Sequence, residues 1–133
     1  MAARDRRTAL AAGLEAYGRG DAFLAHELLE PAWMGTRDLP ERELLQGLIK
    51  LAAAFVHAAR ANPAGVARNL RGARERLANE AGAGARVGLD VPALNTAIER
   101  RLATPIDPGE PPIQIPRLAP ALNAGRAPAR PAD

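Results

Sequence analysis

The residues most able to do chemistry lie in one short stretch, from Asp21 to Trp33. Within it a histidine, His26, precedes two carboxylates, Glu27 and Glu30, in a segment that is otherwise almost entirely apolar. If the segment is helical, residues three or four apart share a face, so His26 and Glu30 are neighbours. An imidazole and a carboxylate at this spacing can ligate a metal ion, exchange a proton or form a buried hydrogen-bonded pair.

Metal binding requires a further ligand, because a metal ion needs about three protein ligands and this helix face supplies two. His57 is the only other histidine. It completes a candidate metal set of His26, Glu30 and His57, with Glu27 as the general base of a metal-dependent hydrolase. The competing interpretation is a buried His/Glu network that fixes helix packing, because buried polar groups usually have protein partners without any ligand. We favour the network and keep a divalent metal as the alternative cofactor.

A second polar face is predicted further along the chain. Gln46, Lys50 and His57 are separated by four and seven residues, which places them on one side of a helix. Lys50 is the only lysine among 18 basic residues. Its stem either carries the amine to water, or the amine is functional and burial lowers its pKa. Because the chain has no cysteine and no Gly-x-Ser-x-Gly motif, the nucleophile in covalent catalysis would have to be Lys50 or a carboxylate.

The apolar pattern predicts an all-α fold, a single-domain bundle of about five helices. Alanine and leucine carry most of the apolar content and β-branched residues are scarce, which favours helix over sheet. Asp21, Asp38 and Asn62 are the expected N-caps. The third helix is apolar on almost every side and should therefore be central, whereas the glycines at 82–88 indicate a flexible linker. We expect helices at residues 4–19, 22–33, 38–61, 63–77 and 92–103.

The C-terminal part has a different composition. Eight of the twelve prolines fall within residues 105–131. We therefore expect a bundle domain at residues 1–103 and a proline-rich tail at 104–133 that is extended or disordered. Ile113, Ile115 and Leu118 are expected to hold the first half of the tail on the bundle.

Charge and composition limit the partners. The net charge is +3, but the basic residues are interleaved with 15 acids and aromatic content is only 3%, so nucleic-acid binding is not expected. Arg68, Arg71 and Arg74 should form a solvated helix face. No apolar run approaches the ~20 residues of a membrane helix. The absence of cysteine favours the cytoplasm. The partners we do expect are a small polar or anionic ligand and further copies of the chain.

Several motifs together resemble one bacterial family. They are His26-Glu27-x-Leu29-Glu30-x-x-Trp33, Gln46-Gly47-Leu48-Ile49-x-Leu51-Ala52, His57 and Asn62-x-x-Gly65. In combination they resemble the family called domain of unknown function 309, over roughly residues 9–77. The resemblance implies a small all-helical cytoplasmic bundle and no particular activity. It also implies a polar pocket formed by His26, Glu27, Glu30, Trp33, Gln46, His57 and Asn62.

Two residues depart from the family pattern. Pro31 removes a backbone donor and disfavours helical geometry at Glu30, which weakens the one-turn spacing of His26 and Glu30. Lys50 is an eighth candidate residue of the predicted pocket. Its positive charge would compete there with a metal ion. We therefore expect a ligand-binding or structural and interaction domain with a buried His/Glu polar cluster. The metal-dependent hydrolase is the alternative, and whether the chain is an enzyme is left open.

Overall fold

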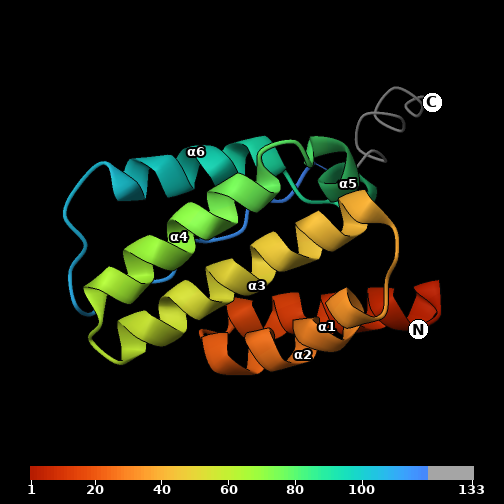
Figure 1. The fold of residues 1–133 in the computed structure, drawn as a ribbon, viewed down its shortest axis with the longest axis horizontal. Coiled ribbons are helices and arrows are strands. Elements are labelled where there is room, and N and C mark those ends of the chain that lie inside the picture. The colour runs from red at the N-terminus through yellow and green to blue at the C-terminus, as the bar shows by residue number, and fades with distance from the viewer. Residues whose placement is uncertain (120–133) are drawn as a thin grey trace, which may run out of the picture.

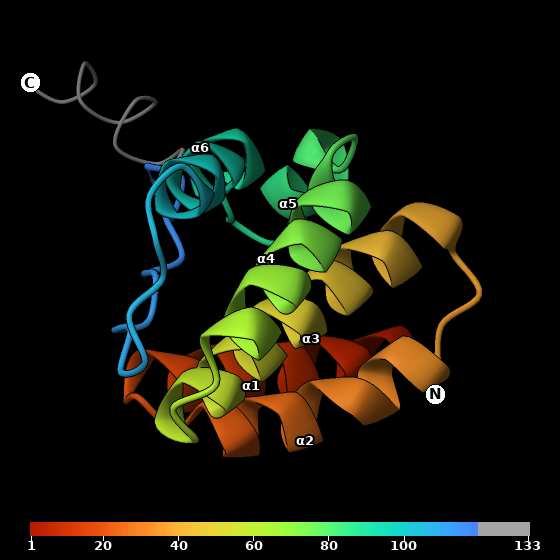
Figure 2. The ribbon, with the colours of Figure 1, turned by 60° about the vertical axis from the view of Figure 1, so that its left-hand side comes forward.

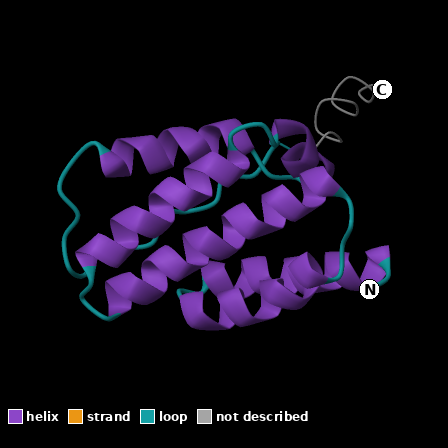
Figure 3. Ribbon diagram, in the orientation of Figure 1, coloured by secondary structure: helices purple, strands orange, loops and turns teal. Residues whose placement is uncertain are grey.

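The computed structural model describes residues 1–119, which form six helices and no β-strand. The helices are α1 (Ala3–Gly18), α2 (Ala22–Met34), α3 (Leu39–Ala59), α4 (Pro63–Leu77), α5 (Ala81–Arg86) and α6 (Val91–Leu102). They stack in three layers, with α1 and α2 in one, α3 and α4 in the next, and α6 with the short α5 in the last (Figures 1 and 2). The predicted all-α bundle is confirmed, and all regular structure in Figure 3 is helical. Over the described range no helix has the length and apolar character needed to cross a membrane.

The third helix is central, as its composition predicts. α3 lies between α2 and α4 (Figure 1) and packs against both. Its buried residues include Leu44, Leu48, Leu51 and Phe55. Removing side chains of this size from water supplies roughly 1.5–3 kcal/mol each, so α3 provides much of the hydrophobic free energy of the fold.

Glycines let α3 and α4 approach closely. A Cβ atom at Gly47 of α3 would lie 2.5 Å from Cγ of Leu77, and one at Gly65 of α4 would lie 2.5 Å from Nδ1 of His57. Both distances are far inside van der Waals contact. The two helices therefore pack at a spacing that only glycine permits at these positions.

Side-chain caps set the starts of four helices. Asp21, Asp38 and Asn62 each accept a hydrogen bond from a backbone N–H three residues on, at 3.0, 3.1 and 3.1 Å. These are the three predicted N-caps. Asp90 caps α6 in the same manner, at 3.0 Å from Ala93 N. Each cap satisfies a backbone donor that the helix itself leaves unpaired.

Helix α2 continues through Pro31, contrary to the expectation that this proline would disturb the helix. Pro31 is exposed, so its ring lies on the solvent side, and its carbonyl accepts a hydrogen bond from Gly35 N at 2.9 Å. The proline costs one backbone hydrogen bond but stands within the last turn of α2. His26 and Glu30 therefore keep their one-turn spacing.

The glycine-rich stretch at 82–88 is not a flexible linker, which corrects the sequence-based prediction. Ala81–Arg86 forms α5, and Ala83 and Gly84 are buried. Gly84 packs directly against Val91, so a side chain there would collide with the start of α6. Gly88 adopts a φ of +78° at the turn into α6, where glycine costs least. Here the glycines serve close packing and a turn.

The first part of the proline-rich tail is ordered along the bundle. The Tyr17 hydroxyl donates to the carbonyl of Ile113 at 2.6 Å, and burial raises the pKa of that hydroxyl well above its ordinary value. Ile113 and Ile115 pack against the core, as predicted, whereas Leu118 is 40% exposed and is held through its backbone N–H on Gly88 O. The rest of the predicted tail, from residue 120, lies outside the described residues.

A buried ion pair fixes the start of this segment. Glu110 is only 5% exposed and accepts a hydrogen bond from Asp107 N at 2.9 Å. Its second oxygen lies 2.7 Å from Nη1 of Arg101 on α6. A buried carboxylate is stable only with partners of this kind. The extended segment is therefore tied to α6 at one end and to α1 and Gly88 at the other.

The close packing of α3 on α4 is testable at Gly47. Gly47→Ala should lower the free energy of unfolding by about 1–3 kcal/mol, because the new methyl overpacks a buried contact with Leu77. The measurement is urea unfolding followed by circular dichroism. Gly82→Ala in α5 is the control, since a Cβ there meets nothing within 4 Å. Equal stability of the two variants would contradict the close approach.

Candidate functional site

The His/Glu cluster predicted on α2 forms at the surface and is not buried. The side chains of His26 and Glu27 are 30% and 53% exposed, and His26 Nδ1 lies 3.7 Å from Glu27 Oε2. The face of α2 that enters the core carries Ala25, Leu29 and Ala32 instead. His26 and Glu30 each follow a core residue by one position, about 100° further around the helix. They are therefore directed away from the core.

His57 and Asn62 stabilise the turn between α3 and α4. Asn62 Oδ1 accepts the Gly65 N–H, which leaves Asn62 Nδ2 to donate to His57 Nδ1 at 3.0 Å. His57 Nδ1 is then the acceptor of this hydrogen bond. The His57 ring also rests on Gly65, so these residues have a structural role at this turn.

Lys50 and Gln46 lie, partly exposed, on the outer side of α3. The Lys50 stem packs across α4, with its Cδ 2.8 Å from the place a Cβ of Gly72 would take. The glycine makes room for the lysine stem beside α4.

Trp33 is engaged with Arg42. The Arg42 guanidinium lies 4.6 Å from the centre of the Trp33 ring and donates to the Trp33 carbonyl at 3.1 Å. This cation–π contact joins the end of α2 to the first turn of α3. Trp33 thus secures a helix connection.

The predicted metal ligands do not converge. Among residues 1–119 no three side chains of histidine, aspartate or glutamate gather closely enough to hold a metal ion. His57 is held against α4 by Asn62, while His26 pairs with Glu27 on α2. The candidate set of His26, Glu30 and His57 is therefore not brought together within residues 1–119.

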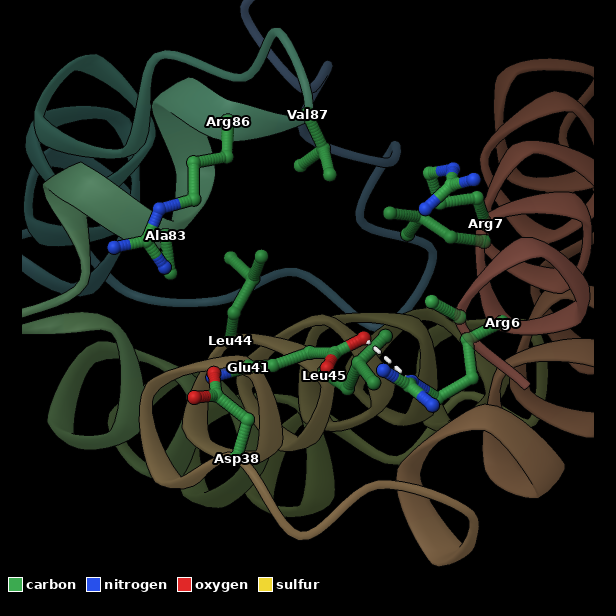
Figure 4. A pocket seen from close by; sticks show the side chains of 11 residues that line it. Arg6, Arg7, Asp38, Glu41, Leu44, Leu45, Ala83, Arg86 and Val87 are labelled. Atoms are coloured by element: carbon green, nitrogen blue, oxygen red, sulfur yellow. Dashed lines mark hydrogen bonds and ion pairs between the residues drawn. The ribbon is translucent and has the colours of Figure 1, made fainter. Parts of the chain in front are cut away.

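A pocket that the sequence did not suggest lies between α1, α3 and the α5 region. Its volume is about 250 Å3. In Figure 4, Arg6 and Arg7 come from one wall, Arg86 and Val87 from the opposite wall, and Leu44 and Leu45 from the floor. The full lining is Ala3, Arg6, Arg7, Leu10, Asp38, Glu41, Leu44, Leu45, Ala83, Arg86 and Val87. We call it the arginine pocket.

One arginine of the pocket is committed to a structural ion pair. Arg6 Nε donates to Glu41 Oε2 at 2.9 Å, and the Thr36 hydroxyl donates to Glu41 Oε1 at 2.7 Å. Desolvation pushes the pKa of Glu41 up, but these hydrogen bonds, together with the charges of Arg6 and Arg7, outweigh it and hold that pKa below its usual value. The same pairing raises the pKa of Arg6. This pair joins α1 to α3 and closes one side of the pocket.

The other two arginines have no such partner. Within residues 1–119 neither Arg7 nor Arg86 forms an ion pair. Asp38 is already used as the cap of α3. Three arginines against two carboxylates leave the pocket with one excess positive charge, above an apolar floor. That combination suits a ligand with an acidic group on an apolar body.

Sequence reasoning missed this pocket because its walls are distant in the chain and because α5 was interpreted as a linker. One signal was available. Arg7, Leu10 and Leu14 follow one another at three- and four-residue steps, which gives a single face of α1 both charge and apolar surface.

Comparison with known proteins supports the resemblance noted in the sequence. Residues 10–69 match the model of a family described as a domain of unknown function, DUF309. No curated protein and no solved structure matches the chain. The matched segment runs from α1 into α4, so it includes the α2 signature and the pocket floor. It does not include Arg6, Arg7 or Arg86.

The surface position of the α2 cluster predicts a small effect of mutation. His26→Ala should change the free energy of unfolding by less than about 1 kcal/mol, because Glu27 stays hydrated without it. Leu29→Ala, on the adjacent buried face, should lose about 2–5 kcal/mol. Thermal and urea unfolding of both variants provide the measurement. A loss for His26→Ala as large as that for Leu29→Ala would show that the cluster is buried.

Proposed function

We propose that this chain is a binding domain that takes a small organic anion, an acidic group on an apolar body, in the arginine pocket. The observation that carries the proposal is the pair of arginines, Arg7 and Arg86, on opposite walls above an apolar floor. Neither has an ion-pair partner within the described residues.

The walls favour an anion over a cation. A carboxylate or phosphate can accept hydrogen bonds from two guanidinium groups at once, and such charge-assisted bonds are stronger than neutral ones. The carboxylate of Glu41 is hydrogen-bonded to Arg6 and Thr36 and forms no ion pair with Arg7 or Arg86 among the described residues. An arriving anion therefore meets one arginine from each of two opposite walls.

The floor favours an apolar body. Leu10, Leu44 and Leu45 are buried residues that line the pocket, with Val87 above them. A ligand that covers this surface gains roughly 25 cal/mol per Å2 of apolar area removed from water. The volume of about 250 Å3 lies below the roughly 300–1,000 Å3 of sites for drug-sized molecules. The pocket therefore suits a short chain and a single acidic group.

Octanoate is a suitable probe, measured by isothermal titration calorimetry. Octylammonium, with the same chain and the opposite charge, and acetate, with the same charge and almost no chain, are the ligand controls. Octanoate should bind and both controls should bind at least tenfold more weakly. Arg7→Gln and Arg86→Gln should each weaken octanoate about tenfold, because a hydrogen bond to a charged group contributes roughly 1.5–3 kcal/mol.

Arg68→Gln is the matched control variant, because Arg68 is an exposed arginine of α4 outside the pocket lining. It should leave the affinity unchanged. Equal binding of octanoate and octylammonium would contradict the proposal. So would an equal loss of affinity in the Arg68 and Arg86 variants.

A further inference from the structure

The exposed face of α2 carries large apolar side chains beside acids. Phe23 and Met34 are 58% and 70% exposed. Glu27 and Glu30 lie between them, at steps of four, three and four residues, so all four share one face. Residues 21–36 contain three acids and no lysine or arginine. The exposed face of α2 thus carries a large apolar side chain near each end, with two glutamates between them.

The arginine pocket continues as a groove along α1. A second hollow shares Arg7, Leu10, Arg86 and Val87 with the pocket and reaches Leu14 and Arg117. A third shares Leu14 and Arg117 with the second and ends at Tyr17, Gly20 and residues 112–115. The three neighbouring hollows, which follow one another along α1 from Ala3 to Gly20, are together called the α1 groove.

The charges of the α1 groove are opposite to those of α2. Arg7, Arg86 and Arg117 lie along it without an ion-pair partner in the described part of the chain. The acid Glu15 in its wall is paired with Arg19, 3.5 Å away. The groove thus carries three arginines that no carboxylate of residues 1–119 pairs with, above Leu10 and Leu14, which are each 7% exposed.

The length of the α1 groove is also close to that of α2. At a rise of 1.5 Å per residue, the groove from Ala3 to Gly20 is about 25 Å long, and the 13-residue α2 is about 20 Å long. A groove of that length exceeds the needs of a small ligand and suits an amphipathic helix.

We propose that α2 of a second copy of this chain docks in the α1 groove, with its glutamates on the arginines and its apolar residues on the floor. This docking rests on the proposed function. It assigns the acidic group and the apolar body that the arginine pocket binds to side chains of α2 from the second copy. A symmetric pairing of two α2 faces is disfavoured, since it would bring Glu27 and Glu30 of both copies together. The contact joins two different surfaces, so it closes into a ring or continues into longer assemblies.

Sedimentation velocity on the full chain tests the proposal. The average mass of the wild-type protein should rise with concentration, and it should fall when salt is raised from 50 to 500 mM or when octanoate is added. Two double variants separate the surfaces. Glu27→Gln with Met34→Ser removes the α2 surface, and Arg7→Gln with Arg86→Gln removes the groove. All four residues are partly or fully exposed, so circular dichroism should show both variants folded.

Each double variant alone should associate at least tenfold more weakly than wild type. Mixed in equal amounts, they should form a discrete 1:1 dimer that grows no further, because one supplies the only intact groove and the other the only intact α2 surface. The α2 variant should still bind octanoate.

Three results would overturn the proposal. They are a wild-type protein that stays monomeric at every concentration at low salt, an α2 variant that associates as well as wild type, and a mixture that forms no dimer. Octanoate binding that persists in any of these cases leaves the proposed function standing. A wild-type protein that does not bind octanoate would contradict both the proposed function and the docking of α2 in the groove.

Discussion

The structure depends on how α1 is covered. Among the helices, α1 packs extensively only against α2. Its other apolar side meets α3, with Leu10 near Leu44 and Leu45 and with Tyr17 edge-on to Phe55, and it also meets the α5 region and the extended segment at residues 112–117. Leu10, Leu14 and Tyr17 are only 6–7% exposed, so the α1 groove runs over a side of α1 whose apolar residues are already largely covered.

Two polar links keep the groove open without letting α1 separate. The Arg6–Glu41 ion pair ties the start of α1 to α3, and the Tyr17 hydroxyl ties its end to Ile113. Both link positions far apart in the chain, and both stand at the margins of the groove. The same ion pair neutralises Arg6 and Glu41, which leaves Arg7 and Arg86 as the charges that face a ligand.

Local features of the fold could be predicted from the sequence, whereas tertiary ones could not. The caps at Asp21, Asp38 and Asn62 and the central position of α3 follow from residues close together in the chain, and the structure confirms them. The helical state of residues 81–86 depends on packing against Val91, which no local pattern reveals. The order of residues 105–119 depends on Arg101, Tyr17 and Gly88 in the same way.

In the candidate site, too, local features could be predicted from the sequence and tertiary ones could not. Helical spacing correctly predicts that His26 and Glu30 share a face, but it does not determine which face of α2 enters the core. That choice follows from Ala25, Leu29 and Ala32, whose burial leaves the polar residues outside. The arginine pocket could not be predicted in this way, because its opposite walls, at residues 6–7 and at residue 86, come together only in the folded chain.

The most direct test of the account is an NMR titration of the arginine Nε–H groups with octanoate. The account predicts that the Arg7 and Arg86 signals shift and saturate together, while Arg6, whose Nε–H is held by Glu41, and Arg68, outside the pocket, stay in place. Shifts of equal size at Arg68 and Arg86, or none at Arg7 and Arg86, would contradict it.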